Sequence, residues 1–286
     1  MANLVGAFAF SHAPSIGSHN RDSSPQWRTV FEGFDELQRR ILALAPDTLV
    51  MVYDDHLDNY FLNALPTFSI GCASSYATAD EGYGPQDLLP VGGHEPLSWH
   101  LATTLIEGGF DLTVCQELLF DHGVLVPLPL IGGRDKRIVP IVVNTVQPPL
   151  PTARRCWQLG QALAAAIRAF PGGERVVVCG TGGLAHQLGG RKMAWIASEF
   201  DRRFLGYLTD GPRAKIAEYT SAEIMAAGNG TNEIRNWIVA AATFPDARGE
   251  LIRYEAFGLT GVGMVQLGPA PAIARAGGAW ATARMA

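Results

Sequence analysis

Four of the seven histidines in this chain stand where an apolar, strand-like run ends. In each case the run comes first and the histidine follows: 5–10 before His12, 49–53 before His56, 118–120 before His122, and 176–179 before His186. In an α/β sheet, ligands bind in the crevice at the carboxyl ends of the strands, so imidazoles from separate strands can converge on one atom. A single histidine is more often a packed core residue. Four in the same topological position predict a shared site.

Two imidazoles need an anionic third ligand to hold a ferrous ion that activates oxygen. Glu233 is the candidate, because helical spacing puts it on the apolar face of Trp237, where an ionised carboxylate must be paired or metal-bound. The residues alone equally allow Glu233 to complement a helix dipole. Asp54 and Asp55, which precede His56, are further candidates, either as ligands or as supports for a ligand.

The glycine-rich stretch Gly180-Thr181-Gly182-Gly183-Leu184-Ala185 fits a loose dinucleotide-binding pattern. Such a fold needs a second strand with an acidic residue about 20 residues later, and here helical sequence follows instead. We therefore interpret the glycines as a sharp turn that presents His186 to the cleft. No Gly-x-Ser-x-Gly motif supports a serine hydrolase.

Composition excludes several classes of protein. The chain has 286 residues, of which 48% are hydrophobic and 17% charged, and its net charge is −5. These values are typical of a compact globular protein and give no basic footprint for nucleic acid or an anionic membrane. The amino terminus has no basic region before an apolar stretch, and four widely spaced cysteines suit a reducing compartment. We expect a cytoplasmic protein with a small substrate.

The pattern of elements predicts one α/β domain over residues 1–286, with strands and helices in alternation. A polar loop is expected over 15–24, and Ser24 should cap a helix that begins at Pro25. Further helices are expected over 96–106, 152–170, 191–208 and 213–227 and from near Thr231. The irregular segment 67–90 suggests a functional loop. The tail from Pro269 is expected to fray.

The assembled motifs resemble the class III extradiol ring-cleavage dioxygenases, and within them the catalytic β subunits of the protocatechuate 4,5-dioxygenases. The resemblance extends from residue 11 to about 267. It rests on Ser11-His12-Ala13-Pro14, Tyr53-Asp54-Asp55-His56, Pro66-Thr67-Phe68-Ser69-Ile70-Gly71-Cys72-Ala73, Ala79-Asp80-Glu81-Gly82-Tyr83-Gly84-Pro85, Asp121-His122-Gly123, and Gly180-Thr181-Gly182-Gly183-Leu184-Ala185-His186.

This resemblance implies a mixed central β-sheet flanked by helices and a non-haem Fe(II) cofactor. It makes His12, His56 and Glu233 the metal ligands and His186 the acid/base. His122 becomes a second catalytic histidine that holds substrate or oxygen. The implied reaction inserts both atoms of O2 into a catechol-type ring and gives a semialdehyde-type product.

The sequence departs from the protocatechuate enzymes at Phe257-Gly258-Leu259-Thr260-Gly261, which replaces a polar loop near the ring carboxylate. Gallate, a methylated gallate, an aminophenol or a hydroxypyridone-like ring therefore stay open as substrates. No segment corresponds to the small α subunit that covers the site in those enzymes, so we expect a homo-oligomer, with a small α-type chain as a further candidate partner. The alternative function is a non-enzymatic binding or scaffold protein on the same fold.

Overall fold

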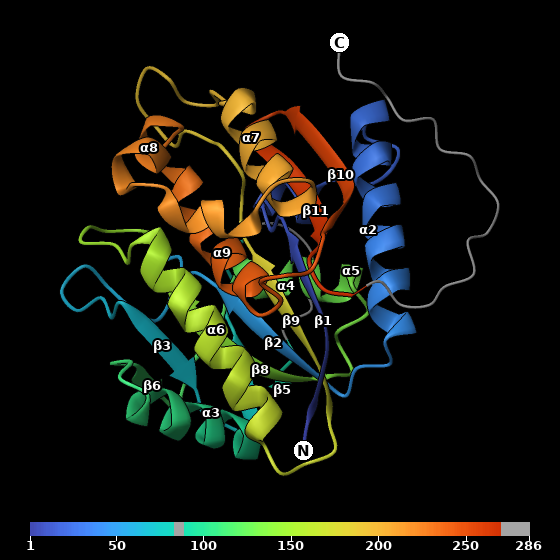
Figure 1. Ribbon diagram of the computed structural model, residues 1–286. Coiled ribbons are helices and arrows are strands. Elements are labelled where there is room, and N and C mark those ends of the chain that lie inside the picture. Colours follow the sequence, from blue (N-terminus) through green and yellow to red (C-terminus); the bar gives the residue numbers. More distant parts are fainter. Residues whose placement is uncertain (83–88, 270–286) are drawn as a thin grey trace.

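The computed structural model describes residues 1–82 and 89–269, in which one large mixed sheet carries helices on both faces (Figure 1). Its strands lie in the order β10-β11-β1-β9-β2-β8-β3-β6, and a small second sheet has the order β5-β4-β7. The strands are β1 (Asn3–Phe10), β2 (Thr48–Tyr53), β3 (Phe68–Gly71), β4 (Ser75–Thr78), β5 (Val91–Gly92), β6 (Thr113–Cys115), β7 (Leu119–Phe120), β8 (Arg137–Val143), β9 (Arg175–Thr181), β10 (Glu250–Phe257) and β11 (Thr260–Gln266).

The four central strands β1, β9, β2 and β8 run parallel to one another. Phe10 pairs with Thr181 and Tyr53 with Val142, so these strands end at the same edge of the sheet. The neighbours on either side, β11 and β3, are antiparallel to the centre. The expected mixed sheet is thus confirmed, and its central strands bring their carboxyl ends together.

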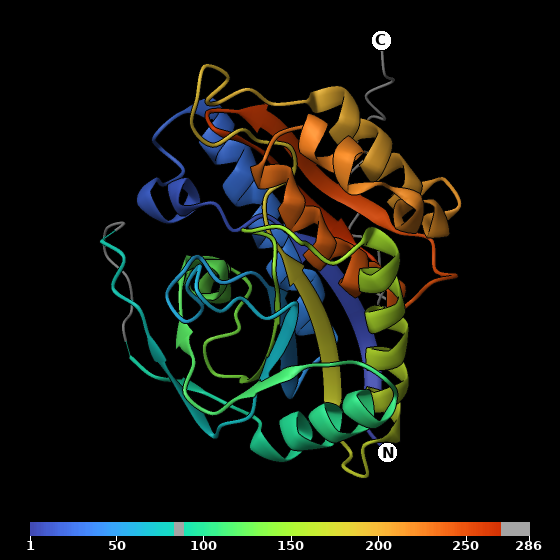
Figure 2. The ribbon, with the colours of Figure 1, turned by 90° about the vertical axis from the view of Figure 1, so that its left-hand side faces the viewer.

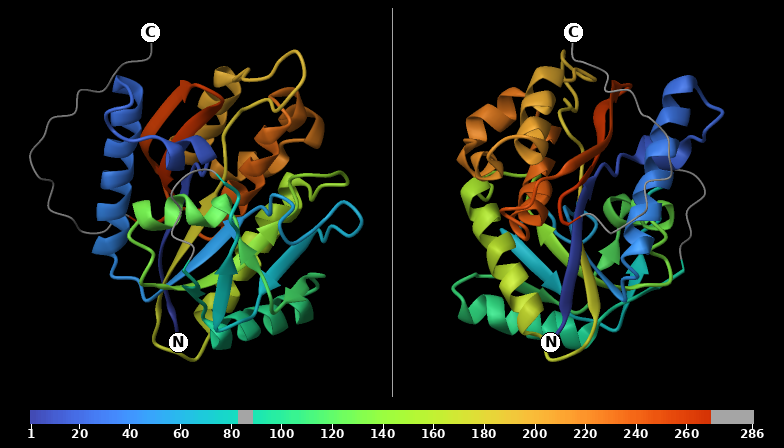
Figure 3. Two further views of the ribbon diagram at one scale, coloured as in Figure 1. Left: turned by 180° about the vertical axis from the view of Figure 1, so that it is seen from behind. Right: turned by 45° about the vertical axis from the view of Figure 1, so that its right-hand side comes forward.

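Helices cover both faces of the sheet. Figure 3 shows α2 and α6 on opposite sides of β1, and Figure 2 shows α3 at the end of the molecule where the N-terminus lies. The helices are α1 (Pro14–Ser18), α2 (Pro25–Ala43), α3 (Glu95–Glu107), α4 (His122–Leu125), α5 (Pro127–Leu130), α6 (Ala153–Ala169), α7 (Ser198–Thr209), α8 (Ser221–Ala226) and α9 (Ile234–Ala242), with 3-10 turns η1 (Arg213–Glu218) and η2 (Gly230–Glu233).

Alternation along β1 explains the two layers of core. Phe8 and Phe10 pack in the cluster that contains the buried side of α2, whereas Ala7 and Ala9 belong to the cluster that contains α6 and α9. The smaller side chains let a helix approach closely. At Gly180 on β9, an added Cβ would lie 2.6 Å from the carbonyl oxygen of Asn236 on α9. This close packing carries the first turn of α9 to the strand ends.

Three of the expected elements differ in the structure. The helix expected over 213–227 is divided into η1 and α8, because Tyr219 and Thr220 take extended backbone angles and Thr220 caps a new helix. The loop expected over 15–24 contains α1, which begins at Pro14 and is anchored by the buried side chain of Ile16. The helix expected over 191–208 begins only at Ser198, because Gly190 and Ala194 take positive φ angles of 70° and 68° and interrupt the helical path. The cap at Ser24 is confirmed, since its hydroxyl accepts from the Trp27 amide at 3.2 Å.

The segment 67–90, of which residues 83–88 lie outside the described residues, contains more regular structure than the sequence predicted. It includes β3, which joins the large sheet, and β4, which pairs with β7 in parallel. The tail that is expected to fray lies outside the described residues from 270 onward. Across residues 1–82 and 89–269, every helix is too short or too polar to cross a bilayer.

Candidate active site

The residues predicted to share a site come together at the carboxyl edge of the sheet. His12 follows β1 and His56 follows β2, and their ring centroids are 5.1 Å apart. His122 opens α4, with its ring centroid 3.8 Å from that of His56 and 5.4 Å from that of His12. His186 lies in the segment after β9, and its side chain is next to Glu233, which also lies next to His12. Separate strands thus bring together four imidazoles, as the sequence indicated.

Glu233 lies between two of these imidazoles. Its Oε2 is 3.3 Å from His12 Nε2, and its Oε1 is 3.4 Å from His186 Nε2. Oε2 also accepts a hydrogen bond from the Gly183 amide. Burial alone would raise the pKa of Glu233, but the charges of His186 and His12 and their hydrogen-bonding capacity outweigh it and hold that pKa well below its usual range. The carboxylate is therefore ionised in the centre of the cluster.

Four side chains could hold a metal ion here. Ligand atoms of His12, Asp54, His56 and Glu233 all lie within 4.8 Å of one another. His12 Nε2 is buried without a hydrogen-bond partner, although it is 3.3 Å from Glu233 Oε2. A buried polar atom of this kind is costly unless something outside the chain binds it. The donor set of imidazole nitrogens and carboxylate oxygens suits Fe(II) and other divalent transition metals.

The hydrogen bonds behind the two metal-facing imidazoles fix their tautomers. Thr181 Oγ1 donates its single proton to the Gly123 carbonyl at 2.9 Å, so it accepts from His12 Nδ1 at 3.1 Å. Asp121 Oδ2 accepts from His56 Nδ1 at 3.0 Å and from the His56 amide at 2.8 Å. In both rings the proton sits on Nδ1. Nε2 is therefore the nitrogen whose lone pair a metal ion would bind, in place of any second proton.

The electrostatic field at His56 favours positive charge. Burial would lower the pKa of His56, but Asp121 and Asp54 outweigh it and raise that pKa well above the usual value for histidine. Asp121 is itself fully buried, and although burial opposes ionisation, His56 keeps the pKa of this carboxyl below its usual value. A pocket that stabilises an imidazolium so strongly also stabilises a divalent cation.

The glycines near His186 leave the space that its side chain occupies. Gly182 has a φ of 147°, and a Cβ there would lie 2.8 Å from the Cβ of Glu233. An added Cβ at Gly230 would lie 1.9 Å from His186 Nε2. His186 Nδ1 donates to the Leu184 carbonyl at 2.9 Å, and Nε2 faces the Glu233 carboxylate, which can only accept and therefore stabilises a proton on Nε2. This geometry supports the interpretation of the glycine-rich turn as a support for His186.

The two aspartates that precede His56 have different surroundings. Asp54 is buried, accepts from Asn236 Nδ2 at 2.7 Å and from Thr145 Oγ1 at 2.9 Å, and lies 3.4 Å from His56 Nε2. Asp55 instead accepts from Asn59 and Tyr60 in the turn that follows β2. Only Asp54 belongs to the site.

Sequence reasoning missed the groups that orient the imidazoles. Asp121 could have been found, because it adjoins His122 at the end of a strand. Glu81, whose Oε1 lies 2.8 Å from His122 Nδ1, gave no such signal because it is 41 residues away from its partner. Thr181 and the Leu184 carbonyl were also not recognisable, since a hydroxyl or a backbone oxygen becomes significant only after the strands are aligned.

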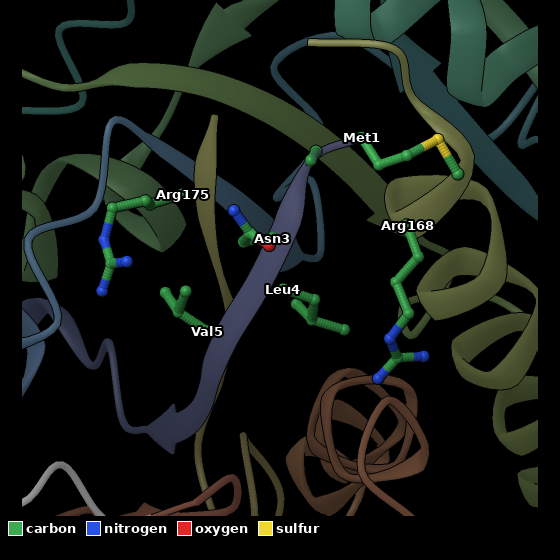
Figure 4. Close-up of a pocket in the computed structure, with 7 residues that line it drawn as sticks. Met1, Asn3, Leu4, Val5, Arg168 and Arg175 are labelled. Carbon is green, nitrogen blue, oxygen red and sulfur yellow. The ribbon is translucent and has the colours of Figure 1, made fainter. Parts of the chain in front are cut away.

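A cavity of about 590 Å³ lies beside the amino-terminal half of β1, away from the histidines. Figure 4 shows the side chains of Arg168 and Arg175 on opposite sides of the strand in this cavity. The guanidinium of Arg175 donates to the carbonyl oxygens of Leu44 and Ala45. These contacts give it a structural role, so the chemistry is assigned to the histidine cluster.

Comparison with known proteins agrees with this geometry. Residues 6–267 match the family described as the catalytic LigB subunit of aromatic ring-opening dioxygenase. Gallate dioxygenase from Pseudomonas putida is 38% identical over 170 residues, which are 58% of this chain and 50% of that protein. A 2,3-dihydroxyphenylpropionate/2,3-dihydroxicinnamic acid 1,2-dioxygenase from Klebsiella pneumoniae is 28% identical over 254 residues, covering 72% of this chain and 79% of that protein.

The chain thus spans about half the length of the gallate dioxygenase that it matches. Among solved structures, that of an uncharacterized protein from Escherichia coli K12 superposes with a TM-score of 0.61 at 16% identity, over 92% of this chain and 100% of that one. This likeness concerns the fold alone. The match over residues 6–267 shows that the chain belongs to the family of catalytic LigB subunits of aromatic ring-opening dioxygenases.

Proposed function

We propose that this protein is an Fe(II)-dependent extradiol dioxygenase that opens a catechol-type ring with both atoms of O2. The observation that carries the proposal is the convergence of His12, His56 and Glu233, in which two Nε2 lone pairs and one ionised carboxylate meet at one point. Two imidazoles and one carboxylate on one face of a metal leave positions open for a chelating diol and for oxygen. Membership in a ring-opening family supports this function.

Fe(II) held by these three residues would act as a Lewis acid that lowers the pKa of a bound hydroxyl and as a centre for dioxygen chemistry. His186 takes the proton that leaves a substrate hydroxyl. Its Nε2 lies 3.4 Å from Glu233 Oε1, which places it beside the metal ligands. Glu233 outweighs the effect of burial and raises the pKa of His186 to about 8, so the imidazole is basic enough to hold that proton.

The substrate is a small aromatic diol or a related hydroxy-amino ring. The turn at Phe257-Gly258-Leu259-Thr260 joins β10 to β11, and only Thr260 in it carries a side chain that can form hydrogen bonds. That hydroxyl donates within the turn to the Gly261 carbonyl at 3.3 Å. A turn without a cationic side chain gives no support for a ring carboxylate at this point. The names of the relatives, gallate and dihydroxyphenylpropionate dioxygenases, define a first set of compounds to test.

The test is oxygen uptake after anaerobic loading with Fe(II). The panel is catechol, 3,4-dihydroxybenzoate, gallate, 3-O-methylgallate, 2,3-dihydroxyphenylpropionate and 2-aminophenol. We expect uptake of one O2 per ring, with a ring-opened product that contains two oxygen atoms from labelled dioxygen. Protein that binds Fe(II) and a diol but consumes no oxygen with any of these compounds would favour the binding or scaffold alternative.

We also propose that the active form is an assembly, either a homo-oligomer or a complex with a small α-type subunit. Apolar side chains are exposed on the segments that follow the carboxyl ends of β2 and β9. They include Phe61 at 57%, Leu62 at 65%, Leu188 at 55% and Met193 at 60% exposed. Apolar surface beside a binding site is typical of a surface that another chain covers.

A further inference from the structure

Glu81 holds His122 through two hydrogen bonds. Its Oε1 lies 2.8 Å from His122 Nδ1, and its Oε2 accepts from the His122 amide at 2.6 Å. Both side chains are largely buried, with exposed fractions of 10% for Glu81 and 6% for His122. A carboxylate that accepts from both the ring and the backbone of one residue fixes the position of that residue and the rotation of its ring.

The same arrangement occurs at the neighbouring imidazole. Asp121 Oδ2 accepts from both the amide and Nδ1 of His56, as Glu81 does at His122. The two rings are in contact, with centroids 3.8 Å apart. Because an ionised carboxylate can only accept, each imidazole carries its proton on Nδ1. When a ring carries a single proton, Nε2 is therefore its acceptor nitrogen.

Strand pairing brings Glu81 to His122. In the small sheet, Thr78 on β4 pairs in parallel with Phe120 on β7, and the Ala79 amide donates to the Phe120 carbonyl at 2.8 Å. The two segments continue side by side beyond this point. Glu81, three positions after Thr78, is thereby brought to His122, two positions after Phe120. The register of a short strand pair thus delivers a carboxylate from the segment 67–90 to the active site.

The acceptor nitrogen of His122 belongs to the same site as the metal-facing imidazoles. One ring nitrogen of each of His12, His56 and His122 lies within 4.8 Å of the other two. Since Glu81 occupies Nδ1 of His122, Nε2 is the nitrogen that can face the bound substrate. An imidazole in this state accepts a hydrogen bond from a hydroxyl and offers no proton to it.

We propose that Glu81 is a positioning residue that holds His122 in the Nδ1–H tautomer, so that Nε2 accepts a hydrogen bond from a hydroxyl of the aromatic substrate. This inference rests on the proposed function for the identity of the hydroxyl. The tautomer itself depends only on the contacts of Glu81. Glu81 is then a contribution to the site from the segment 67–90.

The tautomer can be measured directly by NMR of protein labelled with ¹⁵N-histidine, in which the imidazole shifts distinguish Nδ1–H from Nε2–H. The variants are Glu81→Gln, which keeps the shape but turns one acceptor into a donor, and Glu81→Ala, which removes both contacts. Asp80→Asn is the matched control, because Asp80 is exposed and accepts only from the Gly82 amide at 3.1 Å among its hydrogen bonds with described residues.

We expect wild type and Asp80→Asn to show His122 as the Nδ1–H tautomer, and both Glu81 variants to gain the Nε2–H form. In assays with Fe(II) and a diol that wild type converts, kcat should fall about 10- to 100-fold in Glu81→Gln. This is the range for carboxylates that orient metal-ligating imidazoles. Iron content should stay unchanged. An Nε2–H tautomer in wild type, or an unaltered tautomer in both folded Glu81 variants, would overturn the inference.

The spectra require no substrate, so the two proposals fail separately. If wild type shows the Nδ1–H tautomer that depends on Glu81 but opens no diol ring, the positioning role stands and the proposed function is rejected. If wild type turns over a diol and Glu81→Gln keeps both the full rate and the wild-type spectrum, Glu81 has no positioning role while the function stands.

Discussion

The four imidazoles of the site share one arrangement at the level of single atoms. Each uses Nδ1 toward an oxygen of the chain: Thr181 for His12, Asp121 for His56, Glu81 for His122 and the Leu184 carbonyl for His186. With one ring proton, His12, His56 and His122 each keep an acceptor at Nε2, whereas Nε2 of His186 faces the Glu233 carboxylate. Two of these nitrogens suit a metal ion, and two suit a hydroxyl proton. The chemistry assigned to each ring thus follows from which groups lie near its Nε2.

Glu233 provides the clearest test of the metal ligands. Glu233→Ala removes the carboxylate that lies 3.3 Å from His12 Nε2, so we expect loss of stoichiometric Fe(II) and of turnover. Metal content after anaerobic loading and desalting is the measurement. Glu117→Ala is the control, because Glu117 is an exposed glutamate on the segment after β6. A Glu233→Ala protein with full iron and full activity would exclude Glu233 as a ligand.

A substitution of His186 should affect turnover but not iron content, unlike a substitution of a metal ligand. We expect His186→Phe to keep iron and to bind a diol, but to lose turnover by about 10²- to 10⁴-fold, the usual contribution of a positioned acid/base. His19→Phe serves as the control, since His19 is exposed and stacks on Trp27. Loss of iron in His186→Phe would make His186 a ligand, and an unchanged rate would remove it from the mechanism.

At the level of elements, the sequence predicted the strands and helices that have strong periodicity. The strand that ends before His56 and the helix that begins at Pro25 are confirmed because burial on one face leaves a clear pattern. β10 and β4 were missed. The exposed and partly buried residues of β10 show little contrast between faces, and β4 is a strand of four residues whose partners β5 and β7 have two residues each. Short strands of this kind depend on tertiary pairing rather than on local propensity.

The same limit applies to the site. The sequence could predict which histidines stand at strand ends, since each end is a local feature. It could not predict that α9 begins after a 3-10 turn that carries Glu233, because the position of that turn depends on the contact between Gly180 and Asn236. The distances between Glu233 and the imidazoles result from this packing.

Asp201 on α7 gives a stability prediction for the elements that hold the His186 segment. It accepts from the Ala185 amide at 2.8 Å and from the Tyr254 hydroxyl at 2.8 Å, and burial raises its pKa to about 6. A raised pKa means that the folded protein binds this proton more tightly than the unfolded chain. The stabilising contribution is present at low pH and is lost as the pH rises from about 4 through 6.

Asp201→Asn should remove this dependence. The asparagine oxygen can accept from Ala185, and its amide can donate to the Tyr254 oxygen, so the neutral contacts are kept. We expect a higher melting temperature than wild type at pH 8 and little difference at pH 4, with a free-energy gain of at most about 3 kcal/mol for a pKa raised from 3.8 to about 6. Asp210→Asn, at an exposed aspartate beyond the same helix, is the control. A variant less stable than wild type at pH 8 would contradict the prediction.

At the scale of the whole molecule, the proposed reaction needs a site that excludes water, because solvent would compete for open metal positions. Exposed apolar residues on the segments after β2 and β9 are the surface that another chain would cover. We expect light scattering to show at least a dimer at assay concentration, or a monomer whose activity depends on an added small subunit. Phe61→Ser with Leu62→Ser should weaken the assembly and lower kcat together.

Ile106→Ser is the matched control for that double variant. Ile106 is 45% exposed on α3, which lies at the end of the molecule near the N-terminus and away from the strand ends that carry the histidines (Figure 2). We expect it to change neither mass nor rate. A fully active wild-type monomer that needs no added chain would reject the assembly, and water would then have to be excluded by this chain alone. In that case residues 67–82, which already supply Glu81 to the site, are the first candidates for the cover.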